Sequence, residues 1–287
     1  MRVKYLFFTI IFLLSCSTHN ITNSHSGFIQ IKGSDTIINA VQRLAEEFME
    51  EYPYIFVAVT GGGSGVGIAS LINKTCDIAT ASREMTLKEI ILANNRGIYP
   101  KEHIVAYDGI AVVVNHNNPI DKLTIEDLHN IFTGKVDNWQ NFSWEIKKIV
   151  TLSREVNSGT HMYFKEEIVK LGNKNSKEEF SAQTLLLSSS QAIVEEVVNN
   201  IYAIGYLGMG YLSDRIKPVK IGKNNEFYPP QIEYISNGKY PLSRPLYFYT
   251  NGEPEGIVKL FVDFVFSSKG QKIFFEAGFV PLKLDVY

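Results

Sequence analysis

The chain has 287 residues, of which 45% are hydrophobic and 12% aromatic, a composition typical of a protein with a large buried core. Lysine and arginine together number 28, and aspartate and glutamate 30, which gives a formal net charge of −2. A net negative chain argues against nucleic acid as a partner, because binding to a phosphate backbone depends on a basic field. Any anion would have to be held by local hydrogen-bond donors and not by overall charge.

The first residues have the order of an export signal. Arg2 and Lys4 precede a run of apolar residues, Tyr5 to Leu14. A membrane-spanning helix needs about 20 apolar residues, so this run is too short to cross a bilayer. We therefore expect residues 1–15 to be a signal peptide. Its removal takes away two basic residues and no acid, leaving 26 against 30, or −4.

The signal ends in a sequence that resembles a bacterial lipobox, Leu13-Leu14-Ser15-Cys16, although Leu14 departs a little from the commonest pattern. We expect Cys16 to be the lipidated N-terminus and residues 16–27, which are polar and without periodicity, to form a flexible tether. The alternative is an ordinary secretion signal with an incidental cysteine. In either case Cys76 has no disulfide partner, and we expect it to be a small buried residue beside a strand.

From Phe28 onward, strand-like and helical patterns alternate, which predicts an α/β fold with mainly parallel strand pairing. Thr124 is the expected N-cap of one helix, with Gly134 just past its end. Residues 217–245 look irregular and contain prolines. The predicted strands are 28–32, 54–60, 77–81, 104–115, 149–153, 203–207 and 247–250. The predicted helices are 37–51, 66–73, 87–95, 124–132, one from about Thr160, 191–198, and a single amphipathic terminal helix, 256–277.

No linker rich in Pro, Gly and Ser separates two blocks of this sequence. The chain is nevertheless too long for one small lobe. Two lobes between which the chain crosses more than once would give this pattern.

Three segments share one design, in which a predicted strand is followed by a short loop of small polar residues and then by a helix. Such a loop offers backbone N–H groups and a hydroxyl at a helix N-terminus, where anions bind. A single loop of this kind is more often only a helix cap, but three of them with one arginine point to an oxyanion site. The loops are Gly33–Thr36, Gly61–Gly65, and Asn157–Thr160, with Arg154 just before the third.

Other kinds of site do not fit the sequence. The glycine-rich loop Gly61–Gly67 lacks the lysine of a P-loop and the third glycine of a dinucleotide fingerprint. The six histidines are scattered, with no metal-binding spacing, and no nucleophile motif surrounds Ser64 or Ser158. We therefore expect neither a metal nor a cofactor.

Several stretches, in order along almost the whole mature chain, resemble the phosphate-binding proteins (PstS) of ABC phosphate importers, which have a class II periplasmic-binding-protein fold. These stretches are Gly33–Ile37, Gly61–Gly65, Asp77–Glu84, Arg154 with Ser158–Thr160, Tyr240–Leu246, and Leu123–Gly134 with Trp139.

The resemblance implies a phosphate site built from these loops. By position, it implies Ser34 and Thr36 in the first loop, Ser64 in the second, Arg154 as the charged contact, and Ser158, Gly159 and Thr160 closing the site. It also implies two α/β lobes that close on the ligand. We expect lobe 1 to comprise residues 28–107 and 243–287, and lobe 2 residues 108–242, with crossovers near Tyr107–Asp108 and in the 240–245 stretch.

One position departs from the family, because Ser82-Arg83 stands where some members have Ser-Asp. An aspartate there accepts a hydrogen bond from protonated phosphate, which sulfate cannot offer at neutral pH. We expect Asp108 to supply this acceptor, with Asp35 as second choice, although Asp108 could equally be a turn residue at the hinge. For Arg83 the sequence leaves two roles open, contact with the ligand or support of the loop.

The function implied is capture of inorganic phosphate outside the cytoplasmic membrane and delivery to an ABC permease, by a monomeric lipid-anchored protein that is not an enzyme. Alternatives are a binder of another tetrahedral oxyanion (sulfate, molybdate or tungstate), a secreted phosphatase or esterase using Ser64 or Ser158, and a surface lipoprotein with a structural or host-contact role. The last leaves the three loops unexplained.

Overall fold

A computed structural model describes residues 26–173, 175–223 and 225–282 of the chain. The predicted signal peptide, Cys16 and nearly all of the predicted tether lie outside the described residues.

The main sheet has nine strands within the described residues, in the order β2-β1-β3-β12-β4-β8-β6-β7, with β9 paired to β4. A small second sheet has the order β11-β10-β5. The strands of the main sheet are β1 (Gly27–Gly33), β2 (Ile55–Thr60), β3 (Ile78–Ala81), β4 (Pro100–Val114), β6 (Val150–Arg154), β7 (Leu185–Leu187), β8 (Ala203–Gly208), β9 (Lys217–Pro218) and β12 (Ser243–Asn251). Those of the second sheet are β5 (Lys122–Thr124), β10 (Lys220–Lys223) and β11 (Glu226–Tyr228).

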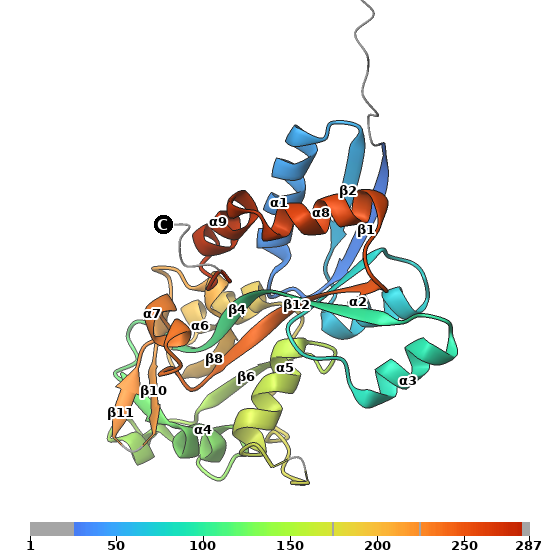
Figure 1. The fold of residues 1–287 in the computed structure, drawn as a ribbon. Helices are drawn as coiled ribbons and strands as arrows, with labels where there is room; N and C mark the ends of the chain where they lie inside the picture. The colour runs from blue at the N-terminus through green and yellow to red at the C-terminus, as the bar shows by residue number, and fades with distance from the viewer. Residues whose placement is uncertain (1–25, 174, 224, 283–287) are drawn as a thin grey trace, which may run out of the picture.

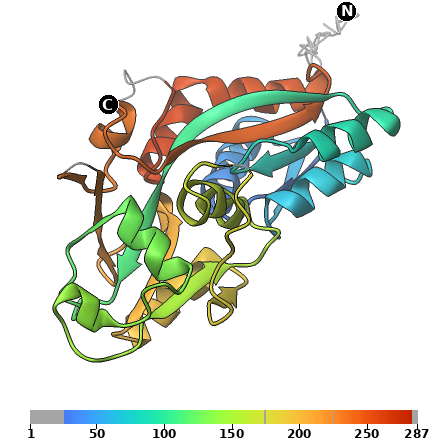
Figure 2. The same cartoon turned by 90° about the horizontal axis from the view of Figure 1, so that it is seen from below.

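The pairing is mixed, which corrects the expectation of mainly parallel strands. Strand β1 pairs in parallel with β2 and β3, and β6 pairs in parallel with β7 and β8. Strand β12, however, is antiparallel to both β3 and β4, and β4 is antiparallel to β8. The long strands β4 and β12 therefore run side by side through the middle of the molecule (Figures 1 and 2).

Most helices lie where the sequence predicts them, and the terminal one is the exception. Instead of one helix over 256–277, two helices meet at Ser267, whose backbone is extended. The Ser267 hydroxyl accepts from Gly270 N at 3.1 Å and caps the second helix, because a serine at such a junction satisfies an otherwise free N–H group. The helices are α1 (Ile38–Glu51), α2 (Ser64–Ile72), α3 (Leu87–Asn95), α4 (Ile125–Phe132), α5 (Gly159–Phe164), α6 (Ser190–Asn199), α7 (Ile232–Ser236), α8 (Gly256–Phe266) and α9 (Ser268–Glu276). Short helical segments are η1 (Trp139–Phe142), η2 (Lys165–Val169) and η3 (Met209–Tyr211).

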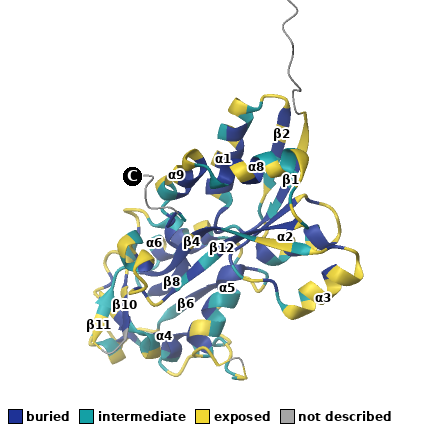
Figure 3. Ribbon diagram, in the orientation of Figure 1, coloured by how far each residue is buried: buried dark blue, intermediate teal, exposed yellow. Residues whose placement is uncertain are grey.

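The buried apolar residues fall into two sets, one on each side of the crossing strands. One set joins α1–α3, α8 and α9 to β1–β3 and to parts of β4 and β12. The other joins α4–α6 to β6, β8 and the second half of β4. We call the two parts lobe 1 and lobe 2. In Figure 3 the strands at the centre are mostly buried, whereas α3 of lobe 1 is largely exposed.

Cys76 lies in a core cluster of lobe 1, 9% exposed, beside β3. Burial raises the pKa of its thiol to about 12, which keeps the sulfur protonated and unreactive. The expectation of a small buried residue is confirmed. Among the described helices, none is both long and apolar enough to cross a membrane.

Candidate anion-binding site

Five side-chain hydroxyls from four loops meet between the two lobes. Ser34 Oγ lies 3.1 Å, and Ser64 Oγ 3.3 Å, from Ser82 Oγ. Thr36 Oγ1 lies 3.3 Å from Ser82 Oγ and 2.9 Å from Thr160 Oγ1. All five residues are at most 3% exposed. We call them the hydroxyl cluster.

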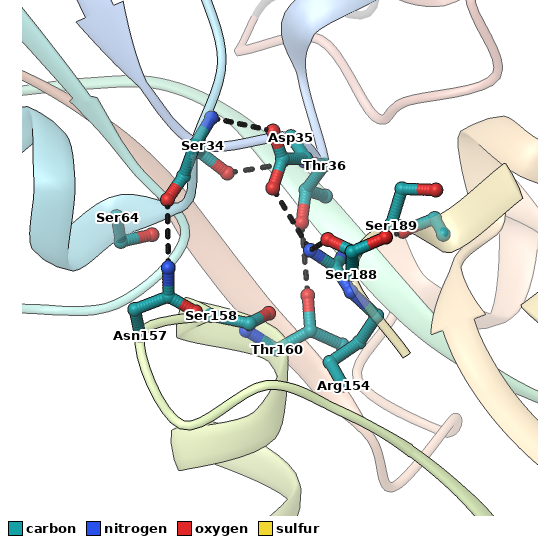
Figure 4. Close-up of polar contacts among 12 residues, drawn as sticks. Ser34, Asp35, Thr36, Ser64, Arg154, Asn157, Ser158, Thr160, Ser188 and Ser189 are labelled. Carbon is teal, nitrogen blue, oxygen red and sulfur yellow. Dashed lines mark hydrogen bonds and ion pairs between the residues drawn. The ribbon is translucent and has the colours of Figure 1, made fainter. Parts of the chain in front are cut away.

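The topology explains why these residues meet. The loops that carry Ser34, Ser64 and Ser82 follow β1, β2 and β3, three neighbouring parallel strands whose carboxyl ends lie at one edge of the sheet. Thr160 comes from lobe 2, in the first turn of α5 after β6. In Figure 4 the labelled residues of the two lobes converge, and Thr36 and Thr160 point toward one another.

The helices that follow the loops differ in whether a side chain accepts a hydrogen bond from the N–H groups of their first turn. Neither α1 nor α2 has a side-chain cap, although in the first turn of α2 Gly65 N already donates to Asn157 O and Val66 N to Gly63 O. Helix α5, in contrast, is capped by Ser158, whose hydroxyl accepts from Thr160 N and His161 N at 3.2 and 3.4 Å. The Ser158 hydroxyl is therefore a helix cap in this structure.

Gly159 lets the loop of lobe 2 come against lobe 1. A Cβ at this position would lie 2.4 Å from Ser64 Oγ and 2.6 Å from Ser82 Oγ, closer than side-chain atoms approach. Glycine is therefore required by the close contact and not by its backbone angles.

Arg154 and Asp35 form an ion pair between the lobes. Arg154 is 1% exposed and donates from Nη2 to Asp35 Oδ2 at 2.8 Å (Figure 4). Its other contacts go to Leu187 O, Ser188 O and Ser190 Oγ. Arg154 is therefore not part of a surface salt bridge, because its side chain is buried. The expected contact of Arg154 with an anion stays a prediction, but the structure shows its guanidinium already bonded to protein atoms.

A second buried ion pair, Asp108 with Arg244, borders the cluster directly. Arg244 donates to Asp108 Oδ2 from Nε at 3.2 Å and from Nη2 at 2.9 Å. The same Nη2 lies 2.8 Å from Thr160 Oγ1 and 3.3 Å from Thr36 Oγ1. Asp108 Oδ1 accepts from Met209 N at 3.1 Å, which leaves that oxygen a free lone pair.

Burial acts against the charge on both partners of this pair. It raises the pKa of the Asp108 carboxyl, and the adjacent Arg244 guanidinium opposes the rise. It also lowers the pKa of Arg244, and Asp108 opposes that change. Because arginine holds its proton in proteins, the pair is kept as an ion pair by mutual neutralisation.

Arg83 does not reach the hydroxyl cluster in this structure. Its Nη1 and Nη2 donate to the two carboxylate oxygens of Glu89, both at 2.8 Å, and Nη1 also donates to Glu84 O. Glu89 belongs to the capping box of α3 with Thr86. These contacts support the loop after Ser82, one of the two roles that the sequence left open.

Sequence reasoning missed Arg244 as a site residue, although it lies in the 240–246 stretch that carried the resemblance. One signal in the sequence could have indicated it, because Arg244 and Asp108 are charged residues within largely apolar stretches, where a charge needs a partner. That they partner each other follows only from the register of β12 with β4.

One cavity lies beside the cluster, between the lobes. It has a volume of 470 Å³, and Arg83, Met162, Tyr163, Arg244 and Tyr247 are among its lining residues. In the described part of the chain, no group of three or more His, Cys, Asp or Glu side chains is placed to hold a metal ion.

Comparison with known proteins decides the family. Residues 18–269 match the family model of the PBP superfamily domain. The chain is 33% identical to the phosphate-binding protein PstS of Staphylococcus saprophyticus, over 91% of this chain and 82% of the relative. It is 30% identical to the PstS protein of Borreliella burgdorferi, over 96% of this chain and 98% of the relative.

The chain belongs to the PstS family.

A solved structure agrees with this assignment. A putative phosphate ABC transporter substrate-binding protein from Clostridium perfringens, solved with bound phosphate, superposes with a TM-score of 0.80 at 30% identity and covers 90% of this chain and 100% of its own. The PstS-family fold, two α/β lobes of the class II periplasmic-binding-protein type, is therefore that of this chain. The expected fold class is confirmed, apart from the mixed pairing of its strands.

Proposed function

We propose that this PstS-family protein binds inorganic phosphate between its lobes, outside the cytoplasmic membrane, and delivers it to the permease of an ABC importer. The observation that carries this function is the hydroxyl cluster, in which Ser34, Thr36, Ser64 and Ser82 of lobe 1 face Thr160 of lobe 2. A ligand held there contacts both lobes, so that binding and lobe closure are coupled.

The chemistry of the cluster suits a desolvated tetrahedral oxyanion. Hydroxyls and the N–H groups of the uncapped first turn of α1 are neutral donors, which bind an anion without requiring a basic protein surface. That property fits a chain whose formal charge is negative. Dedicated donors at several angles also match the several oxygens of phosphate.

Several finer assignments belong to the same proposal. Lobe 1 comprises residues 28–107 and 243–287, and lobe 2 residues 108–242. The two sets of core residues support these bounds, except that Val280 packs into the core of lobe 2. Cys16 carries the lipid anchor, and the protein acts as a monomer without a cofactor.

The protein performs no reaction of its own under this proposal, since the family consists of substrate-binding proteins. A phosphatase would need a base beside Ser64 or Ser158. Among the described histidines, no imidazole bonds to either hydroxyl; the nearest in sequence, His161, pairs with Ser153 Oγ at 3.0 Å.

Isothermal titration of the purified protein with phosphate, sulfate, molybdate and tungstate tests the function. Phosphate is expected to bind more tightly than the others by at least about 100-fold, because a site built to pair with a proton of the ligand rejects anions that lack one. Heat from sulfate, molybdate or tungstate but not from phosphate would replace phosphate with that oxyanion. Turnover of a phosphate ester that one serine substitution abolishes would instead identify an enzyme.

Asp108 is the proposed acceptor for that proton, through the free lone pair of Oδ1. An Asp108→Asn substitution presents an amide near the anion in place of a carboxylate. We expect sulfate to compete with phosphate in this variant at least about tenfold better than in the wild type. Unchanged discrimination between the two anions would remove Asp108 from this role.

A further inference from the structure

Three exposed aromatic residues lie together on lobe 1, at the start of its first two strands. Phe28, Tyr54 and Phe56 are 58%, 63% and 63% exposed. Phe28 and Phe56 are register partners on the paired strands β1 and β2, so their rings lie side by side on one face of the sheet. Tyr54 comes directly before β2, and its carbonyl oxygen accepts from Gly27 N at 3.1 Å. We call Phe28, Tyr54 and Phe56 the aromatic patch.

The exposure of the two phenylalanines is unusual within this chain. No other phenylalanine among the described residues is exposed. The opposite face of the same strands is covered by α1 and α8, and Ile29, Ile31 and Ile55 on that face are 0% exposed. A single exposed ring on a strand needs no explanation. Two exposed phenylalanines side by side, with a tyrosine next to them, form an apolar surface that a partner can cover.

The start of the described chain lies beside this patch. Strand β1 begins at Gly27, one residue before Phe28. Cys16, the expected site of the lipid, is ten residues before Ser26, the first described residue. Even a fully extended chain of ten residues spans at most about 35 Å. A lipid on Cys16 would therefore keep this end of lobe 1 close to a membrane surface.

The patch and the hydroxyl cluster lie at opposite ends of the same strands. The cluster follows the carboxyl ends of β1 and β2, whereas Phe28 and Phe56 are each the second residue of their strand. A strand of six or seven residues is about 20 Å long. In Figure 1 the amino ends of β1 and β2 lie at the top of the molecule, and lobe 2 lies at the lower left. A surface that covers the patch therefore does not cover the anion site.

We propose that the aromatic patch docks on the phospholipid surface beside the anchor and holds lobe 2 away from the membrane. Tyrosine is enriched where a membrane meets water, and phenylalanine is among the residues that enter the boundary between headgroups and acyl chains. This inference rests on the proposed function, because it uses the anchor at Cys16. The contact is weak and reversible, since delivery requires the protein to turn its cleft toward a permease.

Tryptophan fluorescence on vesicles tests the contact without depending on natural lipidation. Residues 16–287 are coupled through the Cys16 thiol to a maleimide-bearing phospholipid in phosphatidylcholine vesicles, whose neutral surface does not repel a negative chain. Cys76 is buried and its thiol stays protonated, so it does not compete. The Phe56→Trp variant places an indole in the patch. The control is Leu87→Trp on α3, where the leucine is 72% exposed.

Brominated phosphatidylcholine quenches an indole that reaches the acyl chains, and the wild type gives the background of its own two tryptophans. We expect the added fluorescence of Phe56→Trp to fall by at least about half, and that of Leu87→Trp to change little. Adding Phe28→Thr and Tyr54→Thr to Phe56→Trp should weaken the quenching at least about twofold, and threonine keeps the strand propensity. Equal quenching in the two tryptophan variants, or none in Phe56→Trp, overturns the proposal.

Phosphate titration of the same proteins separates this proposal from the proposed function. Every variant should bind phosphate as the wild type does, because the patch lies outside the hydroxyl cluster. A wild type that does not bind phosphate refutes the proposed function, whatever the quenching shows. A Cys16 without lipid in the exported protein, measured by mass spectrometry, removes the anchor and with it this proposal.

Two other partners would give different results. A second copy of the chain on the patch would make the wild type a dimer in sedimentation experiments, and Phe28→Thr with Phe56→Thr would make it a monomer. A patch that meets the permease would leave Phe56→Trp unquenched on vesicles, while the threonine variant slows phosphate uptake by cells that carry it. Either result replaces the membrane as the partner of the patch.

Discussion

Gly159 has no Cβ, and the close packing of the hydroxyl cluster depends on this absence. Its backbone is not in the left-handed region, so alanine is sterically possible for the chain itself. The added Cβ would, however, meet Ser64 Oγ at 2.4 Å and Ser82 Oγ at 2.6 Å. We expect Gly159→Ala to keep the fold but lower phosphate affinity at least about tenfold, because the two serines must move away from the positions that they occupy in the hydroxyl cluster.

Calorimetry and urea denaturation of the same sample separate the two effects. The expected result is weakened binding with the unfolding transition still cooperative. Equal phosphate affinity in Gly159→Ala and the wild type would mean that the serine hydroxyls at this contact do not hold the anion.

At the residue scale, the sequence indicated which small polar residues come together better than it indicated the partners of the buried charges. Ser34, Thr36, Ser64 and Thr160 could be predicted because each lies in a loop whose local pattern, strand then helix, indicates its position. The partner of a buried charge has no local signature. Asp108 and Arg244 are 136 positions apart, and Arg154 and Asp35 are 119 apart. Only the register of β4 with β12, and the approach of the lobes, decides which acid meets which arginine.

At the scale of elements, helix α4 has a local signal that the structure confirms. Thr124 accepts from Asp127 N at 3.0 Å, and Asp127 Oδ2 accepts from Thr124 N at 2.8 Å, a reciprocal capping box. We expect Thr124→Ala to lower the free energy of unfolding by about 1 kcal/mol, because one N–H group of the first turn loses its acceptor. Urea denaturation followed by circular dichroism measures the change.

Phosphate affinity is the control for this variant. Helix α4 lies in lobe 2, and none of its residues belongs to the hydroxyl cluster. The affinity should therefore stay within about twofold of the wild type, since a distant cap acts only on stability. A loss of affinity that exceeds the loss of stability would contradict this separation.

Elements whose ends depend on distant partners were the ones that the sequence did not predict. The amphipathic pattern of residues 256–277 continues across Ser267, and periodicity alone does not reveal a break between two helices that both pack on lobe 1. Strand β12 was predicted over four residues but extends from Ser243 to Asn251, because its pairing with β4 supplies the hydrogen bonds. Its antiparallel insertion between β3 and β4 likewise depends on topology.

At the scale of the whole molecule, the lobes are joined by contacts outside the hydroxyl cluster. Asp35 of lobe 1 accepts from Arg154 through its side chain and from the Tyr211 hydroxyl through its carbonyl oxygen, the latter at 2.5 Å. Asn157 of lobe 2 donates to Gly62 O at 2.9 Å and accepts from Gly65 N at 3.1 Å. If the lobes part, these contacts break, so we expect them to help retain a bound ligand without touching it.

Tyr211 offers a test of this idea that leaves the ion pairs and the cluster intact. Tyr211→Phe removes one hydrogen bond between the lobes, worth about 1 kcal/mol, which corresponds to about fivefold in an equilibrium constant. We expect phosphate to dissociate about fivefold faster from this variant, with little change in the association rate, because association starts from parted lobes. Stopped-flow measurement of both rates is the appropriate experiment.

Tyr202→Phe is the matched control, since it removes the same kind of hydroxyl from a bond within lobe 2. Tyr202 donates to Glu145 Oε2 at 2.8 Å, and both residues belong to that lobe. Phosphate should dissociate from the Tyr202→Phe variant at the same rate as from the wild type. If both tyrosine variants release phosphate equally fast, the effect is general loosening and not lobe opening. If Tyr211→Phe alone is faster, the Tyr211 hydroxyl helps to set how long the protein retains its ligand, and thus how readily it can release phosphate to a permease that draws the lobes apart.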